Sequence, residues 1–264
     1  AGLSDNVPAV TLNKMCGSGL KSVIYAHDQI KAGTSELIAA GGMESMTNAP
    51  YLSPKMRAGA RVGHQQMYDH MFLDGLEDAY EPGRLMGTYA EDTAELFQFT
   101  REQQDEYAIG SLNNALNAQK ENAFEKEISP VTIKTRKGEI TIKDDEQPKN
   151  AQPEKIPNLK PAFKKDGTVT AANSSSISDG AAALLISSEE RAGELSLPIR
   201  ATILGHTVHA QKPGMFTTAP IPAAKNLLEK IGWSTNEVDL WEVNDAFAVV
   251  PMGFMKELNI PREK

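Results

Sequence analysis

The sequence contains one cysteine, no excess of basic residues and no long apolar run. A single cysteine cannot form an intrachain disulfide, so a reducing compartment is the simpler expectation and we expect a cytoplasmic protein. Any targeting segment would precede residue 1. No apolar run approaches the roughly 18 residues needed to cross a bilayer, so we expect no membrane partner. A net charge of −8 argues against a nucleic-acid partner.

The first 46 residues are typical of a strand, a helix and a second strand. Residues 7–12 (VPAVTL) predict a short buried strand, and the apolar spacing of residues 16–30 predicts a helix that ends near Gly33. Residues 36–46 predict a second strand that runs into a Gly-Gly turn. Strand, helix and strand in this order predict a parallel pair joined by a right-handed crossover.

Residues 47 to about 166 are polar and rich in Gly, Pro and Met. We interpret them as an insertion between two strands of one sheet. A helical region starts near Gly87, and Thr100 followed by Gln103 predicts a capping box within it. Alternating residues on both sides of Lys137 and Gly138 predict a hairpin.

The remaining residues alternate again between strand and helix patterns. Asp179 or Ser178 is placed to cap a short Ala-rich helix, which would lead into a buried strand ending near Ser188. Further strands are predicted at 199–210 and 239–245, and helices at 221–233 and 246–260. This alternation predicts an α/β layered fold with mostly parallel sheets.

Cys16 comes at the start of the first predicted helix and has two interpretations. Cysteine is among the most buried residue types, which favours a structural thiol. A cysteine at a helix N-terminus, however, meets unpaired N–H groups and the positive end of the helix dipole, and both favour a thiolate nucleophile. Gly17 and Gly19 have no side chains, so a substrate could approach closely. The residues alone leave both interpretations open.

Other chemistry for this segment is not expected. A Walker phosphate loop needs Gly directly before Lys, but Leu20 precedes Lys21. The dinucleotide-binding pattern needs a third glycine where Ser22 stands. None of the five histidines is placed to act as a base for Cys16, and His27 lies about three turns along the same predicted helix.

Two more stretches carry polar residues that suit a ligand site. Residues 241–248 (WEVNDAFA) place Asn244 and Asp245 between a predicted strand and a predicted helix, where α/β folds form ligand crevices. Either side chain could equally cap that helix. Residues 167–180 (GTVTAANSSSISDG) are rich in small hydroxyl residues, which fits a solvated loop or a surface for an extended ligand arm.

Together these stretches resemble the thiolase family. The family's nucleophile segment, N-K-x-C-x-S-G, is present as Asn13, Lys14, Cys16, Ser18 and Gly19. The other matches are AAGGMESMTNAPY, MGTYAEDTA, GTVTAANSSSISDGAAA and WEVNDAFA, the last with Asp245 in place of the family's Glu. The five motifs follow the family's order and span almost all 264 residues.

The resemblance implies a layered αβαβα fold of two similar halves with mixed, mostly parallel sheets. It places the N-terminal half at 1–190, with an inserted loop domain at about 47–166, and a truncated C-terminal half at 191–264. The family's first strands and its later G-H-P and C-x-G-G segments have no match here. The chain is therefore expected to be an internal fragment, incomplete at both ends, that exposes sheet edges and neither folds stably nor turns over alone.

The resemblance also implies an activity. Thiolases join two acetyl-CoA reversibly into acetoacetyl-CoA and free CoA, with no cofactor and no metal. Cys16 matches the cysteine that becomes acylated, and Asn244 matches the asparagine that holds an oxyanion-hole water. A second family cysteine abstracts the α-proton. The residues at positions expected near CoA or the acyl group are Leu76, Met86, Lys149, Phe163, Ala171, Ser175, Phe216, Ala246 and Phe247.

Preference within the family depends on smaller features. The short MESMTNAPY segment favours the acetoacetyl-CoA type, an acetyl-CoA C-acetyltransferase. Leu85 and Phe216 stand where other residues are common in acetyl-specific members, so a 3-ketoacyl-CoA thiolase of fatty-acid β-oxidation is an alternative. A non-catalytic CoA-binding relative is an alternative of another class. The resemblance further implies a homodimer or homotetramer.

Overall fold

The structure, a computed structural model, describes residues 2–264. They form two compact units, which are considered one at a time. Unit 1 contains the described residues up to Arg84 together with Ile177–Val208 and Glu229–Gly232, and unit 2 contains Leu85–Ser176, His209–Leu228 and Trp233–Lys264. No helix within residues 2–264 is long and apolar enough to cross a membrane.

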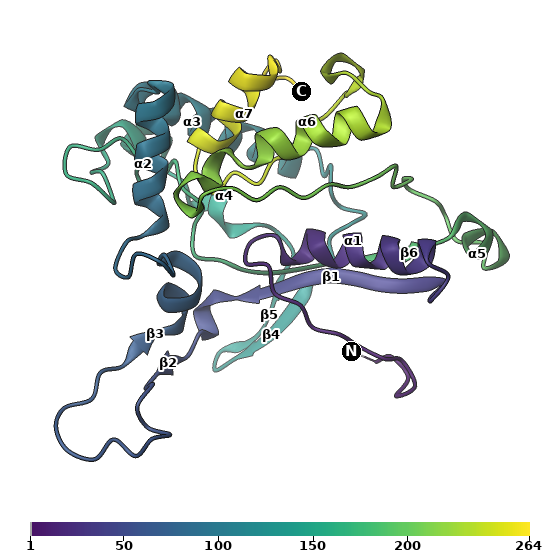
Figure 1. The fold of residues 1–264 in the computed structure, drawn as a ribbon, viewed down its shortest axis with the longest axis horizontal. Coiled ribbons are helices and arrows are strands. Elements are labelled where there is room, and N and C mark those ends of the chain that lie inside the picture. The colour runs from purple at the N-terminus through teal and green to yellow at the C-terminus, as the bar shows by residue number, and fades with distance from the viewer. Residues whose placement is uncertain (1) are drawn as a thin grey trace. The chain divides into compact units, whose positions relative to one another are not determined.

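Unit 1 is built on one helix packed against two long strands. Helix α1 (Ser18–Lys31) lies along β1 (Leu37–Ser45) and β6 (Asp179–Ser187), as Figure 1 shows. The strands pair antiparallel over their full length, from Leu37 opposite Ser187 to Ser45 opposite Asp179. The other elements are η1 (Met46–Asn48), β2 (Tyr51–Leu52), β3 (Tyr68–Asp69), a π-helix η2 (Phe72–Leu76) and α5 (Glu189–Glu194).

The structure confirms the predicted helix at 16–30 and the predicted strand at 36–46, but it corrects the way the strands pair. Residues 7–12 form no strand, and Val10 is 84% exposed. The parallel crossover is therefore wrong, because β1 pairs with β6 instead. The ladders between named strands in residues 2–264 are all antiparallel, not mostly parallel.

The predicted Ala-rich helix after Asp179 is also wrong. Residues 179–187 are strand β6, and the Asp179 carboxylate accepts hydrogen bonds from the Thr47 backbone N–H (3.0 Å) and hydroxyl. Pairing with β1 outweighs the local helix propensity of the alanines. The strand is not buried as expected, since Leu184 and Leu185 are 57% and 56% exposed.

Two further predicted strands, 199–210 and 239–245, are extended segments without a ladder. A strand is stabilised by backbone hydrogen bonds to a neighbouring strand, and no such neighbour lies beside these segments within residues 2–264. The two strand predictions are therefore wrong.

Unit 2 is mainly helical. Helices α2 (Met86–Phe97) and α3 (Arg101–Lys120) are separated at Gln98, whose φ of 56° is left-handed and ends α2. Thr100 and Gln103 form the predicted capping box, with the Gln103 N–H donating to the Thr100 hydroxyl at 3.3 Å and the Thr100 N–H donating to Gln103 Oε1 at 2.9 Å. Two later helices, α6 (Pro220–Ile231) and α7 (Val249–Leu258), confirm the helical predictions for the end of the chain.

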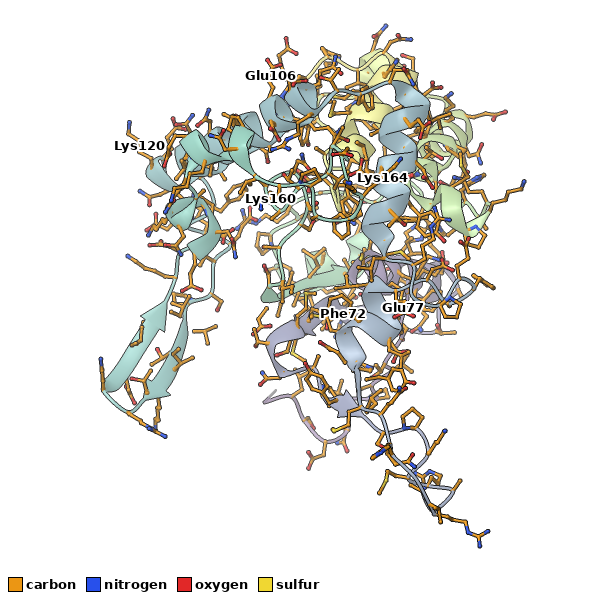
Figure 2. The ribbon with its side chains drawn as sticks, turned by 90° about the vertical axis from the view of Figure 1, so that its left-hand side faces the viewer. Phe72, Glu77, Glu106, Lys120, Lys160 and Lys164 are labelled. Carbon is orange, nitrogen blue, oxygen red and sulfur yellow. The ribbon has the colours of Figure 1, made fainter. Side chains whose placement is uncertain are left out.

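The predicted hairpin is present in unit 2 as β4 (Val131–Thr135) and β5 (Gly138–Ile142). Gly138 has a φ of 123°, which a residue with a side chain rarely adopts. The hairpin extends away from α3, whose last residue Lys120 is labelled in Figure 2. The shorter elements of the unit are α4 (Glu146–Asn150), η3 (Pro153–Asn158), η4 (Pro213–Thr218) and η5 (Thr235–Glu237).

Candidate active site

Cys16 lies in a tight turn that leads into α1. The preceding residue, Met15, has a left-handed φ of 49°, which is uncommon for a residue with a side chain. Asn13 Oδ1 accepts a hydrogen bond from the Met15 N–H at 2.8 Å. The Ser18 hydroxyl accepts one from the Lys14 N–H and donates one to the Met15 carbonyl, both at 2.8 Å. Asn13 and Ser18 thus hold the turn that presents Cys16.

The position of Cys16 suits a nucleophile better than a structural thiol. Cys16 is exposed, and it precedes Gly17, the N-cap of α1. No side chain caps this helix, so the N-terminal N–H groups and the positive end of the helix dipole face the segment that carries the thiol. The thiol is therefore open to a substrate at the start of the helix. The alternative of a buried thiol is wrong.

Gly19 has a different role from the one expected. A Cβ added to Gly42 of β1 would lie 3.0 Å from the Gly19 Cα, and one added to Gly19 would lie 3.6 Å from the Gly42 Cα. The two glycines therefore allow the first turn of α1 to lie directly on β1. Gly19 serves this packing, whereas we expected it to leave room for a substrate.

In unit 2 the structure brings the Asn244 segment together with the predicted ligand-arm segment. The Ser175 N–H donates to the Ala246 carbonyl at 2.9 Å, and the Ala248 N–H donates to the Asn173 carbonyl at 2.9 Å. The Ser175 hydroxyl also donates to the Asp245 carbonyl at 3.1 Å. The two segments consequently run antiparallel, with a bridge between Ser174 and Phe247. Asn244 is exposed on the second segment.

Neither Asn244 nor Asp245 caps a helix. Helix α7 begins at Val249, its N-cap is Ala248, and no side chain caps it. The capping interpretation is therefore wrong. Asp245 Oδ2 instead lies 3.5 Å from the hydroxyl of Tyr107 on α3.

Burial affects both members of this pair. Burial raises the pKa of Asp245, and burial followed by the charge of Asp245 raises the pKa of Tyr107 to about 12. Tyr107 therefore remains a neutral donor beside Asp245 over the ordinary pH range.

A buried polar network holds the segment that contains Ser175, and the sequence did not reveal it. Asn173 is 4% exposed and donates from Nδ2 to Asp105 Oδ1 at 3.2 Å and to the Thr168 carbonyl at 3.1 Å. Its Oδ1 accepts from the Thr170 N–H at 2.8 Å. Arg101 pairs with Asp105 at 2.7 Å. The sequence could have pointed to Asn173, which lies within the GTVTAAN motif. It could not have pointed to Asp105, which stands among many polar residues of α3.

Five of the predicted substrate residues gather at one apolar cluster of unit 2, centred on Ala90, Val169 and Val249. Phe247 is only 8% exposed and meets Phe163 edge to face at 6.0 Å, so it packs in the core. A Cβ on Gly87 would lie 2.3 Å from the Phe163 ring. The absence of a side chain at Gly87 therefore lets the ring lie directly on α2. The cluster members from the prediction are Met86, Phe163, Phe216, Ala246 and Phe247.

The other predicted residues lie outside this cluster. Ala171 is exposed in the segment that leads to Ser175. Lys149 is exposed on α4 and forms an ion pair with Asp144. Leu76 belongs to unit 1, where it is the half-buried last residue of the π-helix η2 that follows the labelled Phe72 in Figure 2. The assignments of all these residues to a ligand stay predictions.

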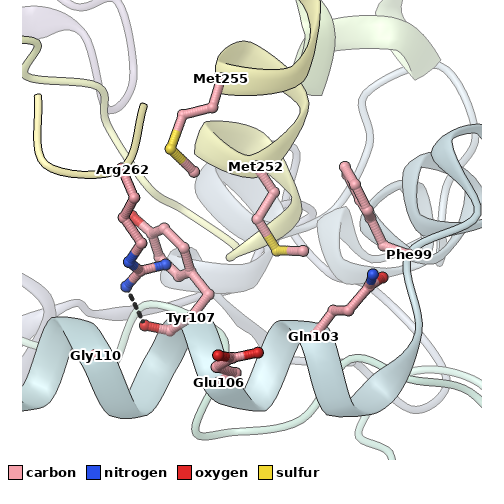
Figure 3. Close-up of a pocket in the computed structure, with 8 residues that line it drawn as sticks. All are labelled: Phe99, Gln103, Glu106, Tyr107, Gly110, Met252, Met255 and Arg262. Carbon is pink, nitrogen blue, oxygen red and sulfur yellow. Dashed lines mark hydrogen bonds between the residues drawn. The ribbon is translucent and has the colours of Figure 1, made fainter. Parts of the chain in front are cut away.

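Two cavities of unit 2 bear on the predicted site. The smaller, about 140 Å³, is lined by Ser175 and Asp245 together with Tyr107, so predicted site residues contribute to it. The larger, about 440 Å³, lies between α3, α7 and Arg262, and none of the predicted site residues lines it (Figure 3). There the Arg262 guanidinium lies 4.2 Å from the centre of the Tyr107 ring and donates to the Tyr107 carbonyl at 2.9 Å.

Comparison with known proteins decides the family. The model of the thiolase N-terminal domain matches residues 1–190, and that of the thiolase C-terminal domain matches residues 197–264. The chain belongs to the thiolase family. Its α/β fold is shared with solved thiolases.

Two relatives match the whole thiolase chain. One is a probable acetyl-CoA acetyltransferase of Dictyostelium discoideum, 44% identical over 100% of this chain and 64% of its own length. Another is a probable acetyl-CoA acyltransferase of Staphylococcus aureus, 42% identical over 100% of this chain and 67% of its own length. The chain thus spans about two-thirds of the length of these relatives.

Solved thiolase structures agree. A thiolase from Ascaris suum in complex with coenzyme A is 41% identical, with a TM-score of 0.91 over 98% of this chain and 66% of that one. The acetyl-CoA acetyltransferase of Bacillus anthracis is 39% identical, with a TM-score of 0.93 over 100% of this chain and 66% of that one.

Proposed function

We propose that this thiolase is an acetyl-CoA C-acetyltransferase in which Cys16 is the acyl-accepting nucleophile. The Cys16 thiolate attacks the thioester carbonyl of one acetyl-CoA, the carbon–sulfur bond to CoA breaks, and CoA leaves as a thiolate that takes up a proton. A second acetyl-CoA loses an α-proton, and its carbanion attacks the acyl-Cys16 carbonyl. The new carbon–carbon bond gives acetoacetyl-CoA and releases the Cys16 thiolate.

The single observation that supports this role is the presentation of Cys16. Asn13 and Ser18 hold a left-handed turn that leaves the thiol exposed immediately before the uncapped N-terminus of α1. The exposure of the thiol admits a thioester. A relative and a solved structure named acetyl-CoA acetyltransferases support the acetyl substrate.

Asn244 is proposed to hold the water of the oxyanion hole. Its segment is fixed by hydrogen bonds to the segment of Ser175, which gives it the rigid placement that charge stabilisation requires. Cys16 is the only cysteine of these 264 residues, so the α-proton step, which the family resemblance gives to a second cysteine, is assigned to no residue here.

Alkylation with iodoacetamide tests the proposal directly. In the full-length protein that contains these residues, Cys16 is expected to react faster than free cysteine near neutral pH, with acetyl-CoA slowing the reaction and activity lost in proportion to labelling. The Cys16→Ser variant of the same protein is expected to lose this fast labelling and the activity. Labelling no faster than free cysteine, with no protection by acetyl-CoA, would instead support a non-catalytic CoA-binding relative.

A second candidate function is the 3-ketoacyl-CoA thiolase of fatty-acid metabolism. The broader name of the Staphylococcus relative, acetyl-CoA acyltransferase, favours it. Rates of thiolysis measured for acetoacetyl-CoA and for long-chain 3-ketoacyl-CoA distinguish the two. Comparable rates on both substrates would favour the second candidate.

The remaining features are proposed on the resemblance, except the location, which is proposed on the single cysteine. The partners are acetyl-CoA, acetoacetyl-CoA and CoA, all substrates or products, with no cofactor and no metal in the reaction. The assembly is a homodimer or homotetramer, and the location is cytoplasmic. Light scattering after size-exclusion chromatography measures the number of subunits in the assembly, and fractionation of cells measures the location.

A further inference from the structure

Unit 1 contains a cluster of three metal-ligating side chains that the proposed reaction does not use. His27 and Asp28 come from α1, and His206 comes from the extended segment 199–208. Asp28 Oδ1 lies 3.1 Å from His27 Nδ1 and 2.7 Å from His206 Nε2. All three donor atoms lie within 4.8 Å of one another. The two rings stand nearly perpendicular, at 85° with 5.2 Å between their centres.

Two imidazoles and one carboxylate are a recurrent ligand set for divalent transition metals. Histidine nitrogen and carboxylate oxygen bind Zn²⁺ at about 2.0–2.2 Å, and catalytic zinc sites with three protein ligands leave a fourth position for water. Neutral imidazoles with one carboxylate carry a single negative charge, which partly balances a divalent cation. Hydrogen bonds from His206 and then His27 lower the pKa of Asp28, so this ligand is charged at neutral pH.

We propose that His27, Asp28 and His206 form a binding site for a divalent transition metal of the zinc class. The cluster is open on one side, since the Asp28 side chain is 52% exposed, whereas those of His27 and His206 are 20% and 24% exposed. The partly buried rings fix two ligands, and the open side admits the ion and a water.

Binding requires only a small local change. Tetrahedral ligands at about 2.0–2.1 Å from the ion lie roughly 3.3 Å apart, so Asp28 must withdraw slightly from His206. The N–H protons that both rings donate to Asp28 move to the other ring nitrogens by exchange with water, which leaves the ligating nitrogens unprotonated. The Lys230 ammonium donates to the His206 backbone carbonyl at 3.1 Å.

The site is separate from the thiol chemistry. His27 lies nine residues beyond Ser18, which is about 14 Å along the helix at 1.5 Å per residue, so an ion there cannot touch Cys16. Its effect is to tie the middle of α1 to the segment that carries His206. A bound ion therefore stabilises unit 1 by mass action, whether or not the proposed reaction is correct.

Titration of the purified full-length protein that contains these residues with Zn²⁺ tests the site. The Cys16→Ser background removes the single thiol of these 264 residues as a competing zinc ligand. We expect one Zn²⁺ per chain by calorimetry, and a visible absorption band when Co²⁺ replaces it. His27→Ala, Asp28→Asn and His206→Ala are each expected to weaken binding at least about tenfold. Asp28→Asn preserves size, so it remains informative if an alanine variant misfolds by circular dichroism.

His70→Ala is the matched control. His70 pairs with Asp74 at 2.8 Å but has no third ligand among residues 2–264, so its loss is expected to leave Zn²⁺ affinity unchanged. The site is overturned if the background protein binds no Zn²⁺. It is equally overturned if His70→Ala and the three cluster variants weaken binding to the same extent, because zinc would then be held by scattered surface histidines.

Discussion

The carboxylate of Glu91 on α2 accepts hydrogen bonds from three donor groups, two on Thr168 and one on Val169. The N–H groups of both residues lie 2.9 Å from Glu91 Oε1, and the Thr168 hydroxyl lies 3.0 Å from Oε2. Glu91 is 5% exposed, so these donors have no access to bulk water. Glu91 therefore anchors the start of the segment that runs from Thr168 to Ser175.

Glu91→Gln is expected to destabilise unit 2. The amide replaces one acceptor with a donor that faces backbone N–H groups, and hydrogen bonds to a charged group contribute roughly 1.5–3 kcal/mol. The free energy of unfolding in urea is expected to fall by about 2–3 kcal/mol. Glu95→Gln is the control on the same helix, because that side chain is 75% exposed and 4.0 Å from Lys164. Equal losses in both variants would contradict the anchoring role.

Gly41→Ala is expected to disrupt the β1–β6 pair. A Cβ at Gly41 would lie 2.1 Å from the Ala182 carbonyl oxygen, which cannot move without breaking the ladder. Overpacking of this kind costs about 1–3 kcal/mol, and we expect the upper end of that range in urea unfolding. Gly180→Ala, in β6 of the same ladder, has nothing within 4 Å of the added Cβ and is expected to change stability little. A small effect at Gly41 would show that the strands separate more easily than the structure implies.

Asn173→Ala is expected to loosen the segment that holds Ala248 as well as lower stability. The change leaves Asp105 Oδ1 and the Thr170 N–H without their partner, and each buried unpaired group costs about 1–3 kcal/mol. Hydrogen exchange of the Ala248 N–H, which donates to the Asn173 carbonyl, is expected to accelerate. The exposed Asn114 on α3 provides the control, Asn114→Ala, with no change expected. An unchanged exchange rate of the Ala248 N–H would show that the Asn173 side chain does not hold this segment in place.

Tyr107→Phe is expected to change the alkaline behaviour of the protein. The ordinary pKa of 10.0 is raised to about 12 in the folded state, so between these values the unfolded chain loses its proton first. The free energy of unfolding contributed by this group therefore falls as pH rises from about 10 to about 12, and is intact below pH 10. When the absorbance of the six tyrosines is followed as pH rises, the change near pH 12 is expected to be missing in Tyr107→Phe. This change is the late component of the titration.

Tyr80→Phe is the reference for that titration, because Tyr80 is 78% exposed. It is expected to leave the late component of the titration unchanged. If the late component persists in Tyr107→Phe, another tyrosine is responsible.

The sequence by itself determined the local features of this thiolase. Neighbouring residues decide a helix and its cap, so the Thr100–Gln103 capping box, the hairpin at Lys137–Gly138 and the placement of Cys16 before a helix were all predictable. The motif around Cys16 also indicated the family. The structure adds that Asn13 and Ser18 of this motif hold the turn that presents Cys16.

Tertiary structure alone decided the rest. Residues 179–187 have the local propensity of a helix, but hydrogen bonding to β1 makes them a strand. Asn173 meets Asp105, and His206 meets Asp28, across long separations in sequence, and no periodicity reports such contacts. Long-range pairing depends on which surfaces are left to bury and which hydrogen-bonding groups are left to satisfy, and only the folded chain fixes those.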